Sequence, residues 1–463
     1  MAQLETQAGT TPGQGDAVAK NDEAGSPPGR TDEAASGTQA ASTPVGGSRA
    51  VESRQGWTLA ILCLVPFIMV LGNSLLIPIL PELQRALHIS PARAGLLITV
   101  FSFPAGLIIP FSGFLSDQWG RRVVMAPALV MYGLGGLVAG IAGWLLGEKA
   151  WGWVLTGRVL QGVGAGGTYQ LAMAMVGDTY TGSRRPWALG LLEAANGLGK
   201  VVAPLVGAAT GLIIWFLPFF VYGVLALPAA ALLWWVAQER PPAGQPPGLG
   251  EYFHNLTGLF RQKGLALAIN YAAGFLVLGT LFGVLSFVSD RLGATTRWTL
   301  FSRGLILAIP VAVMALASYI IGTVLQKRLQ AWVHWLVPVG LVLVAAGCLL
   351  YLLVSQPAAQ IAVVAGGVGL GTGLTLPAVN TLVTSAAPRR GRGVVTSVYG
   401  TLRFFGVAAG PPLFGAVPAS RPWPAFVGAA AALGAVALLS ALVVQEETLL
   451  DSGAAPAGAG GSG

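Results

Sequence analysis

Apolar segments recur along almost the whole chain after residue 56. Each is about 20 residues long, which lets a helix cross the roughly 30 Å hydrocarbon core of a bilayer. Continuous apolar runs of this length favour helices, because a helix satisfies its own backbone groups in lipid. The pattern predicts an all-α integral membrane protein with twelve transmembrane helices, near 57–81, 93–115, 123–146, 152–178, 187–213, 217–237, 264–288, 303–325, 333–354, 358–384, 394–417 and 423–444.

The predicted spans fall into two groups of six. A polar, proline-rich segment between the sixth and seventh spans cannot cross a membrane and is typical of a linker. The N-terminal end has no apolar run and a composition typical of disorder. We expect a disordered cytoplasmic tail at 1–54, a six-helix bundle at 55–237, a central cytoplasmic linker at 238–263, a second six-helix bundle at 264–445 and a flexible tail at 446–463.

The two halves share a pattern of small residues and proline. Gly199 and Pro204 in the fifth span match Gly406 and Pro411 in the eleventh span at the same spacing. Small residues let helices approach closely, and a proline loosens the backbone where neighbours can compensate. Ordinary glycine-rich packing would explain a single copy. Matched copies favour an internal repeat and therefore two pseudo-symmetric bundles.

Composition excludes a water-soluble protein and gives no sign of an enzyme. Hydrophobic residues make up 54% of the chain and charged residues 10%, whereas soluble domains carry about a quarter charged residues. Two cysteines lie inside apolar runs, and three histidines have no metal-ligand spacing. A membrane-embedded enzyme would need a clustered nucleophile, paired acids or metal ligands. We therefore expect no catalytic residues, no cofactor, no metal site and no nucleic-acid partner.

The net charge of +8 comes mainly from loops that alternate along the chain. Loops rich in Lys and Arg stay on the cytoplasmic side of a membrane, which predicts that both termini are cytoplasmic. Basic residues around the loop after the seventh span weaken this bias without reversing it. The bases that set the orientation are Arg121, Arg122, Arg184, Arg185, Arg240, Arg261, Lys263, Lys327, Arg328, Arg389, Arg390 and Arg392.

The loop after the second span reads GFLSDQWGRR at 113–122. It resembles the loop 2–3 signature of the major facilitator superfamily and departs from it at Gln118, where a base is usual. The resemblance implies a gate that joins the two halves on the cytoplasmic side. The candidate gate residues are Gly113, Asp117, Gly120, Arg121, Arg122 and Asp178.

Elementary electrostatics supports a gate at this loop. Asp117 can accept hydrogen bonds from a helix N-terminus in the other half, and Arg121 can pair with Asp178 at the end of the fourth span. Such a cluster opens when one charge is neutralised, which makes a bistable element. The alternative is a merely solvated loop that follows the charge bias.

The fourth span contains an arginine. Arg158 begins a segment similar to the superfamily's second signature, R-x-x-Q-G-x-G, with Gln161 and Gly162 in place. A charge inside a span is costly and usually faces an aqueous cavity or an acid. We expect Arg158 to take part in proton coupling. Snorkelling to the outer interface is the alternative.

The fifth span looks like the antiporter signature, with alanine replacing glycine at 203 and 208. That signature separates antiporters from importers, so it points to export. With the other two signatures, the resemblance identifies the chain as a member of the major facilitator superfamily, in its twelve-helix drug:proton antiporter branch. The residues that carry the antiporter pattern are Gly190, Gly199, Pro204 and Gly207.

The fifth span also holds an acid well inside a predicted helix. Glu193 lies about two turns before Lys200, so both lie on one face of the helix. A carboxylate in such a place can load and release a proton, and Glu193 is the candidate for proton coupling. The alternative is a structural counter-ion for Lys200 or Arg403.

A central cavity between the bundles would be lined by Asn73, Asn196, Lys200 and Arg403. Together with Arg158, these give three bases against the single acid Glu193. A positive cavity disfavours cations and suits neutral or anionic amphiphiles.

These features predict a proton-coupled exporter of a small amphipathic compound or drug, which works by alternating access. A dedicated exporter of a siderophore, a secondary metabolite or a lipid-linked sugar is the alternative. An importer would lack the antiporter signature, and a sensor would carry a folded soluble domain. We expect a monomer in the inner (plasma) membrane whose partners are the substrate, protons and the lipid bilayer.

Overall fold

The computed structural model describes residues 45–180, 184–237, 239, 249–324, 329–386 and 392–443. The chain divides into two units, Met1–Ser48 and Arg49–Gly463, and the architecture below belongs to the second. Most of the tail predicted at 1–54, and all of the tail predicted at 446–463, lie outside the described residues. So do five bases used to predict orientation: Arg240, Lys327, Arg328, Arg389 and Arg390.

The described part of the first half is entirely helical. Its elements are α1 (Val45–Ser74), η1 (Ile77–Ile79), α2 (Leu80–Leu87), α3 (Pro91–Trp119), α4 (Arg121–Leu146), η2 (Gly147–Ala150), α5 (Trp151–Gly166), α6 (Tyr169–Thr179), α7 (Arg184–Ile213) and α8 (Leu217–Val236).

The second half is helical in the same way. Its elements are α9 (Leu249–Thr295), α10 (Leu300–Tyr319), the π-helical turn η3 (Ile320–Val324), α11 (Leu329–Leu353), α12 (Pro357–Val363), the π-helical turn η4 (Val364–Gly369), α13 (Leu370–Ser385), α14 (Arg392–Gly415) and α15 (Trp423–Val443).

Ten stretches of the described residues are long and apolar enough to cross a membrane. One of them, Arg121–Thr179, holds both α4 and the α5–α6 pair, which pack against each other as two crossings. The helix α14 adds another, because its 24 residues pack along α3 and α9 although two arginines lower its hydropathy. The described helices therefore make twelve crossings, and the predicted all-α membrane fold is confirmed.

Local sequence explains where several helices begin. Ser90 caps α3, since its Oγ accepts from the backbone N–H of Arg93 at 3.3 Å, and Pro91 follows at the first helical position. Thr299 caps α10 in the same way through the N–H of Ser302 at 3.2 Å. Between the caps, large apolar side chains are exposed on the outer helices, as lipid-facing surfaces require.

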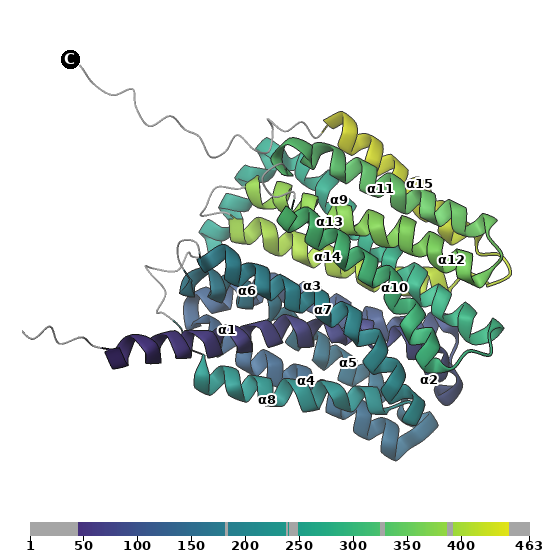
Figure 1. The fold of residues 1–463 in the computed structure, drawn as a ribbon, viewed down its shortest axis with the longest axis horizontal. Coiled ribbons are helices and arrows are strands. Elements are labelled where there is room, and N and C mark those ends of the chain that lie inside the picture. The colour runs from purple at the N-terminus through teal and green to yellow at the C-terminus, as the bar shows by residue number, and fades with distance from the viewer. Residues whose placement is uncertain are drawn as a thin grey trace, which may run out of the picture. The chain divides into compact units, whose positions relative to one another are not determined.

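The helices form two groups, α1–α8 and α9–α15, which lie against each other along α3 and α14 and along α7 and α10 (Figure 1). The predicted repeat appears in their packing. A Cβ at Gly199 would lie 2.9 Å from the carbonyl oxygen of Phe67 on α1, and one at Gly406 would lie 2.9 Å from Cα of Phe275 on α9. Equivalent glycines thus bring α7 onto α1 and α14 onto α9.

The predicted linker at 238–263 is partly helical. The helix α9 starts at Leu249, and its backbone leaves helical geometry at Lys263, where φ is −125° and ψ is 16°. The transmembrane part of α9 therefore starts where the linker was predicted to end. We call the ends of the helices at Gly120, Glu239 and Lys263 the linker face, and the ends at His88, Gly147 and Thr295 the far face.

Candidate functional site

A polar cluster lies on α6, α7 and α14, where the two halves meet. The hydroxyl of Tyr169 on α6 donates to Oε1 of Glu193 on α7, and Asn196 lies beside the same hydroxyl. Lys200, further along α7, experiences the charges of both Glu193 and Arg403, and Arg403 also acts on Tyr169. The structure thus brings together four residues that the sequence analysis assigned to proton coupling or to the cavity, and it adds Tyr169.

Arg403 of this cluster is held by an aromatic ring. Its guanidinium carbon lies 5.4 Å from the centre of the Tyr399 ring, one turn earlier on α14. A cation over an aromatic face is attracted by the ring's electron density. The contact keeps the charge of Arg403 at the boundary between the halves, and no acid among the described residues forms an ion pair with it.

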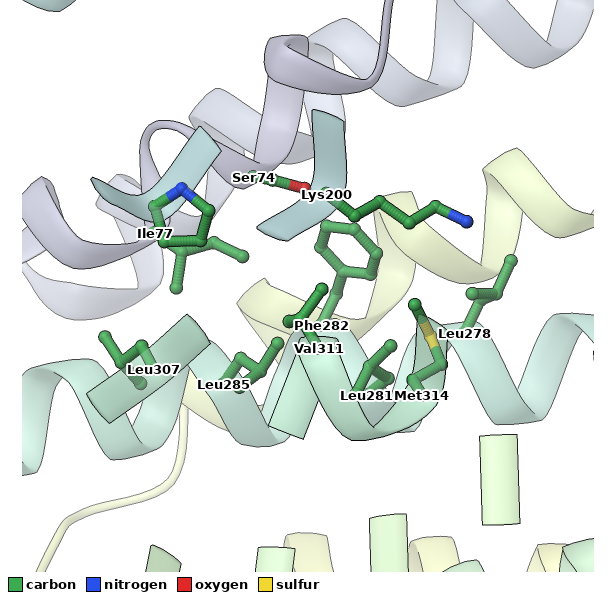
Figure 2. Close-up of a pocket in the computed structure, with 11 residues that line it drawn as sticks. Ser74, Ile77, Lys200, Leu278, Leu281, Phe282, Leu285, Leu307, Val311 and Met314 are labelled. Carbon is green, nitrogen blue, oxygen red and sulfur yellow. The ribbon is translucent and has the colours of Figure 1, made fainter. Parts of the chain in front are cut away.

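Lys200 also borders a pocket between α1, α7, α9 and α10. Figure 2 shows its side chain extended above apolar side chains from α9 and α10. The pocket encloses about 30 Å³, which is room for one or two water molecules and too little for an organic substrate. In this conformation Lys200 lies directly against the apolar side chains of α9 and α10, with no room for a substrate between them. The remaining lining residues are Ser74, Ile77, Pro204, Leu278, Leu281, Phe282, Leu285, Leu307, Val311 and Met314.

Packing between α7 and α10 loosens from the far face towards the linker face. A Cβ at Gly304 would lie 2.9 Å from the carbonyl oxygen of Pro204, whereas one at Gly197 would have its nearest neighbour, Ala315, 4.0 Å away. A Cβ at Gly190 would meet nothing within 4 Å, and Glu193 is exposed. The polar cluster is therefore reached from the linker face.

The far face is sealed by polar contacts between the halves. Nη2 of Arg303 on α10 lies 2.7 Å from Oε1 of Glu82 on α2. Nε2 of Gln84 donates to Oδ1 of Asp290 on α9 at 2.6 Å. We call these four residues the far-face seal.

Close packing accompanies the seal. The hydroxyl of Ser289 donates to the carbonyl of Ile77 at 2.7 Å, and a Cβ at Gly293 would lie 2.9 Å from Cβ of Pro81. A side chain at Gly293 would require α2 and α9 to move slightly apart. The seal closes the route from the pocket to the far face.

The loop at 113–122 makes its described contacts within the first half and with Glu239. Nε of Arg121 lies 2.6 Å from Oδ2 of Asp178, and Nη2 of Arg121 lies 3.4 Å from Oδ1 of Asp117. Arg122 donates to the carbonyl of Ala237 at 3.2 Å, at the end of α8. These contacts fasten the α3–α4 turn to α6 and α8.

The loop approaches the second half at Gly113. A Cβ at Gly113 would lie 3.8 Å from Oγ of Ser397 on α14. The beginning of α14, where a partner for Asp117 was expected, adjoins residues outside the described part. The gate assignment remains a prediction.

Glu239 caps the helix that follows the turn. Its carboxylate accepts from the backbone N–H groups of Arg121 and of Arg122, the latter at 2.9 Å. A negative charge is favourable at a helix N-terminus, where N–H groups have no helical partner. Gly120 makes the approach possible, because its φ of 100° is strained for any residue with a side chain.

Arg158 is fully buried inside the first bundle. Its Nε donates to the carbonyl of Leu97 at 2.9 Å, Nη1 to Oε1 of Gln161 at 2.6 Å and Nη2 to Oδ1 of Asn73 at 2.9 Å. The ring of Phe101 lies 4.4 Å from its guanidinium carbon. The charge is thus satisfied by neutral groups from α1, α3 and α5.

This arrangement corrects three expectations about Arg158 and Asn73. Arg158 has no exposed surface, so it neither faces an aqueous cavity nor snorkels to the interface, and its hydrogen-bond partners are neutral rather than acidic. Asn73 is 6% exposed, and both ends of its amide are hydrogen-bonded. Its Oδ1 accepts from Arg158, and its Nδ2 donates to Oγ of Ser102 at 2.6 Å. Neither side chain lines the pocket at Lys200. The reason is the set of neutral acceptors that three helices supply, which makes burial of the cation tolerable.

The glycines of the antiporter pattern differ in their surroundings. A Cβ at Gly199 would collide with α1, and one at Gly207 would collide with the carbonyl of Leu75. Gly190 lies in open space. Two of the three glycines therefore serve the contact between α7 and α1.

Sequence reasoning missed Tyr169, the far-face seal and Glu239. A polar aromatic residue two positions after the glycine-rich stretch 162–167 could have drawn attention to Tyr169. The seal and the cap join residues 206, 221 and 118 positions apart, and no local pattern predicts such pairs.

Comparison with known proteins agrees with this architecture. A family model described as Major Facilitator Superfamily matches residues 62–411. A bacillibactin exporter of Bacillus subtilis (strain 168) is 32% identical over 365 residues, which cover 78% of this chain and 90% of that protein. Multidrug efflux protein YfmO of the same strain is 30% identical over 373 residues, with coverage of 78% and 85%.

Among solved structures, a bacterial homologue of the human lysosomal transporter Spinster, in an inward-facing and occupied conformation, shares the fold. The TM-score is 0.64 at 18% identity, covering 83% of this chain and 94% of that chain. The family model spans most of this chain, and two relatives of at least 30% identity are transport proteins. The chain therefore belongs to the Major Facilitator Superfamily and is a multi-pass membrane transporter, not an enzyme.

Proposed function

We propose that the protein is a proton-coupled antiporter that exports a small amphipathic compound, neutral or anionic, by alternating access. The observation that carries the proposal is the cluster of Glu193, Lys200 and Arg403 at the boundary of the halves. It lies beside an apolar wall, it is reached from the linker face, and the far face is sealed. A titratable acid among cations can exchange a proton for a substrate that neutralises those cations.

The charge of the cluster supports the substrate class. Two bases, Lys200 and Arg403, accompany one acid, Glu193, since Arg158 is satisfied inside the first bundle. A substrate with an anionic or polar group gains from the excess positive charge, while a cation is repelled. The apolar side chains of α9 and α10 suit the hydrophobic part of the same molecule.

The transporter could export many compounds or one dedicated metabolite. The relative named for multidrug efflux supports a pump for many compounds. The antiporter pattern of α7 supports the twelve-helix drug:proton antiporter branch. The relative named for bacillibactin export supports a dedicated exporter of one metabolite. The small closed pocket favours neither, because its shape changes when the halves move apart.

We place the linker face in the cytoplasm, with both termini on that side of the inner (plasma) membrane. The basic residues Arg121, Arg122 and Lys263 all lie at this face. The polar cluster is then accessible from the cytoplasm, whereas the pocket at Lys200 is too small for substrate until the halves move apart. Since the polar cluster and the seal are complete within one chain, a monomer suffices for transport. Asp117, Arg121 and Asp178 would steady the first half as the gate opens and closes.

Glu193→Gln tests the proposal in inverted vesicles with an acidic interior, where an antiporter accumulates labelled substrate as protons leave. The variant should abolish accumulation driven by the pH gradient, because the amide cannot carry a proton. Substrate binding and thermal stability should stay near wild type. Glu148→Gln, the same change at an exposed acid of the far face, should transport normally. Accumulation by Glu193→Gln at the wild-type rate would overturn the assignment.

A further inference from the structure

A break in the fourth transmembrane segment separates α5 from α6. The helix α5 ends at Gly166, and Thr168 has φ −123° and ψ −71°, outside helical geometry. The break is held by side chains: the hydroxyl of Thr168 donates to the carbonyl of Ala165 at 2.7 Å, and that of Ser112 donates to the carbonyl of Gly166 at 2.8 Å. Two carbonyls next to the break thus have side-chain partners, one of them from the neighbouring helix α3.

The break determines where the next two side chains lie. Tyr169 reaches the carboxylate of Glu193 on α7. Gln170 reaches the second half, since a Cβ at Gly400 on α14 would lie 3.0 Å from its Nε2. The start of α6 thus touches the acid of the proposed coupling site and the opposite bundle at the same time.

The hydroxyl of Tyr169 interacts differently with the two forms of Glu193. An O–H that donates to a carboxylate stabilises the charged form, and hydrogen bonds to charged groups are stronger than those to neutral ones. The other charged groups around the cluster, among the described residues, are Lys200 on the same helix and Arg403 on α14. Both are cations and act on Glu193 through their charge, whereas the Tyr169 hydroxyl gives the carboxylate a direct hydrogen bond.

We propose that Tyr169 is a positioning residue for Glu193, which rests on the proposed function of that acid. Its hydroxyl holds the ionised carboxylate in place on α7, and protonation of Glu193 weakens this hydrogen bond. The break at Gly166–Thr168 aims the hydroxyl, and Gln170 links the same turn to the other half. Tyr169 thereby sets the pH at which the transporter exchanges its proton.

Tyr169→Phe tests the inference, because it removes only the hydroxyl. Infrared titration of the purified protein follows the carboxyl band that Glu193→Gln eliminates, and vesicles give the pH profile of transport. Without the Tyr169 hydroxyl the ionised carboxylate of Glu193 loses a hydrogen bond, so Glu193 is protonated more easily. The midpoints of the infrared titration and of the transport profile should both move up by about one pH unit, a tenfold change in proton affinity. Glu193→Asp, too short to reach Tyr169, should shift in the same direction.

The matched control is Tyr132→Phe, since Tyr132 is a buried tyrosine of the same half whose hydroxyl donates to the carbonyl of Ile68 at 2.8 Å. It should leave the midpoint in place. A merely structural role for Tyr169 would lower the amount of active protein without moving the midpoint, and an unmoved midpoint in Tyr169→Phe overturns the inference. Failure of the proposed function is separate, because it shows as driven transport in Glu193→Gln.

Discussion

Lys200 is the residue on which the substrate class depends. It is the cation at the edge of the pocket, and Glu193 and Arg403 both act on it. A substrate anion that replaces the attraction of Glu193 would let that acid take up a proton. Glu193 and Lys200 lie on one face of α7. The substrate can therefore replace Glu193 as the negative charge near Lys200 without movement of the helix.

Lys200→Met is expected to reduce export of an anionic amphiphile about 10- to 100-fold in kcat/KM, because a hydrogen bond to a charged group is lost. A neutral analogue of the same shape should lose much less. Lys200→Arg, which keeps the charge, serves as the control. Equal losses for the anionic and neutral compounds in vesicle transport would contradict the electrostatic role.

The hydrogen-bond partners of Arg158 could not be predicted from the sequence. Its place inside a span led us to expect an aqueous cavity or an acidic partner, because an isolated charge in lipid is too costly, and the structure shows neutral partners instead. A backbone carbonyl of α3, Asn73 of α1 and Gln161 come together only in the packed bundle.

At the scale of elements, α2 is the part of the first half that closes the far face. It is a short helix of eight residues between α1 and α3, and it carries Glu82 and Gln84 of the seal. One carboxylate oxygen of Glu82 and two nitrogens of Arg303 are buried without a partner in the described structure. Such groups make the seal weaker than its ion pair suggests, which suits a contact that has to open.

A disulfide between α2 and α9 should lock the transporter. Pro81→Cys with Gly293→Cys, in a Cys63→Ser, Cys348→Ala background, places two Cβ atoms close enough for a small backbone adjustment to allow the bond. Oxidation should stop transport, and a reductant should restore it. Each single-cysteine variant should transport equally with and without oxidant. Full transport by the cross-linked protein would mean that the far face does not open there.

Hydropathy predicted the transmembrane elements because about 20 apolar residues have few alternatives to a membrane helix. It did not predict the interruptions within them. Thr168 leaves helical geometry inside one predicted span, and π-helical turns occur at Ile320–Val324 and Val364–Gly369. These depend on side chains of neighbouring helices that re-satisfy the backbone, and their positions follow from packing rather than from periodicity.

At the scale of the molecule, the two contacts between the halves differ. The helices α3 and α14 stay close over their length, from Gly415 near Pro91 to Thr401, whose hydroxyl donates to the carbonyl of Gly106 at 2.8 Å. The helices α7 and α10 touch towards the far face and separate towards the linker face. A pair of bundles joined in this way can rock, opening one face as the other closes.

The matched glycine patterns predicted the symmetry of this arrangement, and the structure shows its packing basis at Gly199 and Gly406. The asymmetry was not predictable. Glu193 and Lys200 have no equivalents in the second half, where the matching helix carries Arg403. Which face is closed depends on long-range contacts such as that of Arg303 with Glu82.

Alternating access is the central claim, and two electron-resonance distances measured in parallel test it most directly. One spin-label pair, at Arg93 and Arg297, spans the halves at the far face; the other, at Gln118 and Leu265, spans them at the linker face, all in a background without Cys63 and Cys348. Across the pH range in which transport turns on, each pair should show two distance populations. The fraction with a long far-face distance should equal the fraction with a short linker-face distance. A single unchanged distance for both pairs, in protein that transports, would contradict the account.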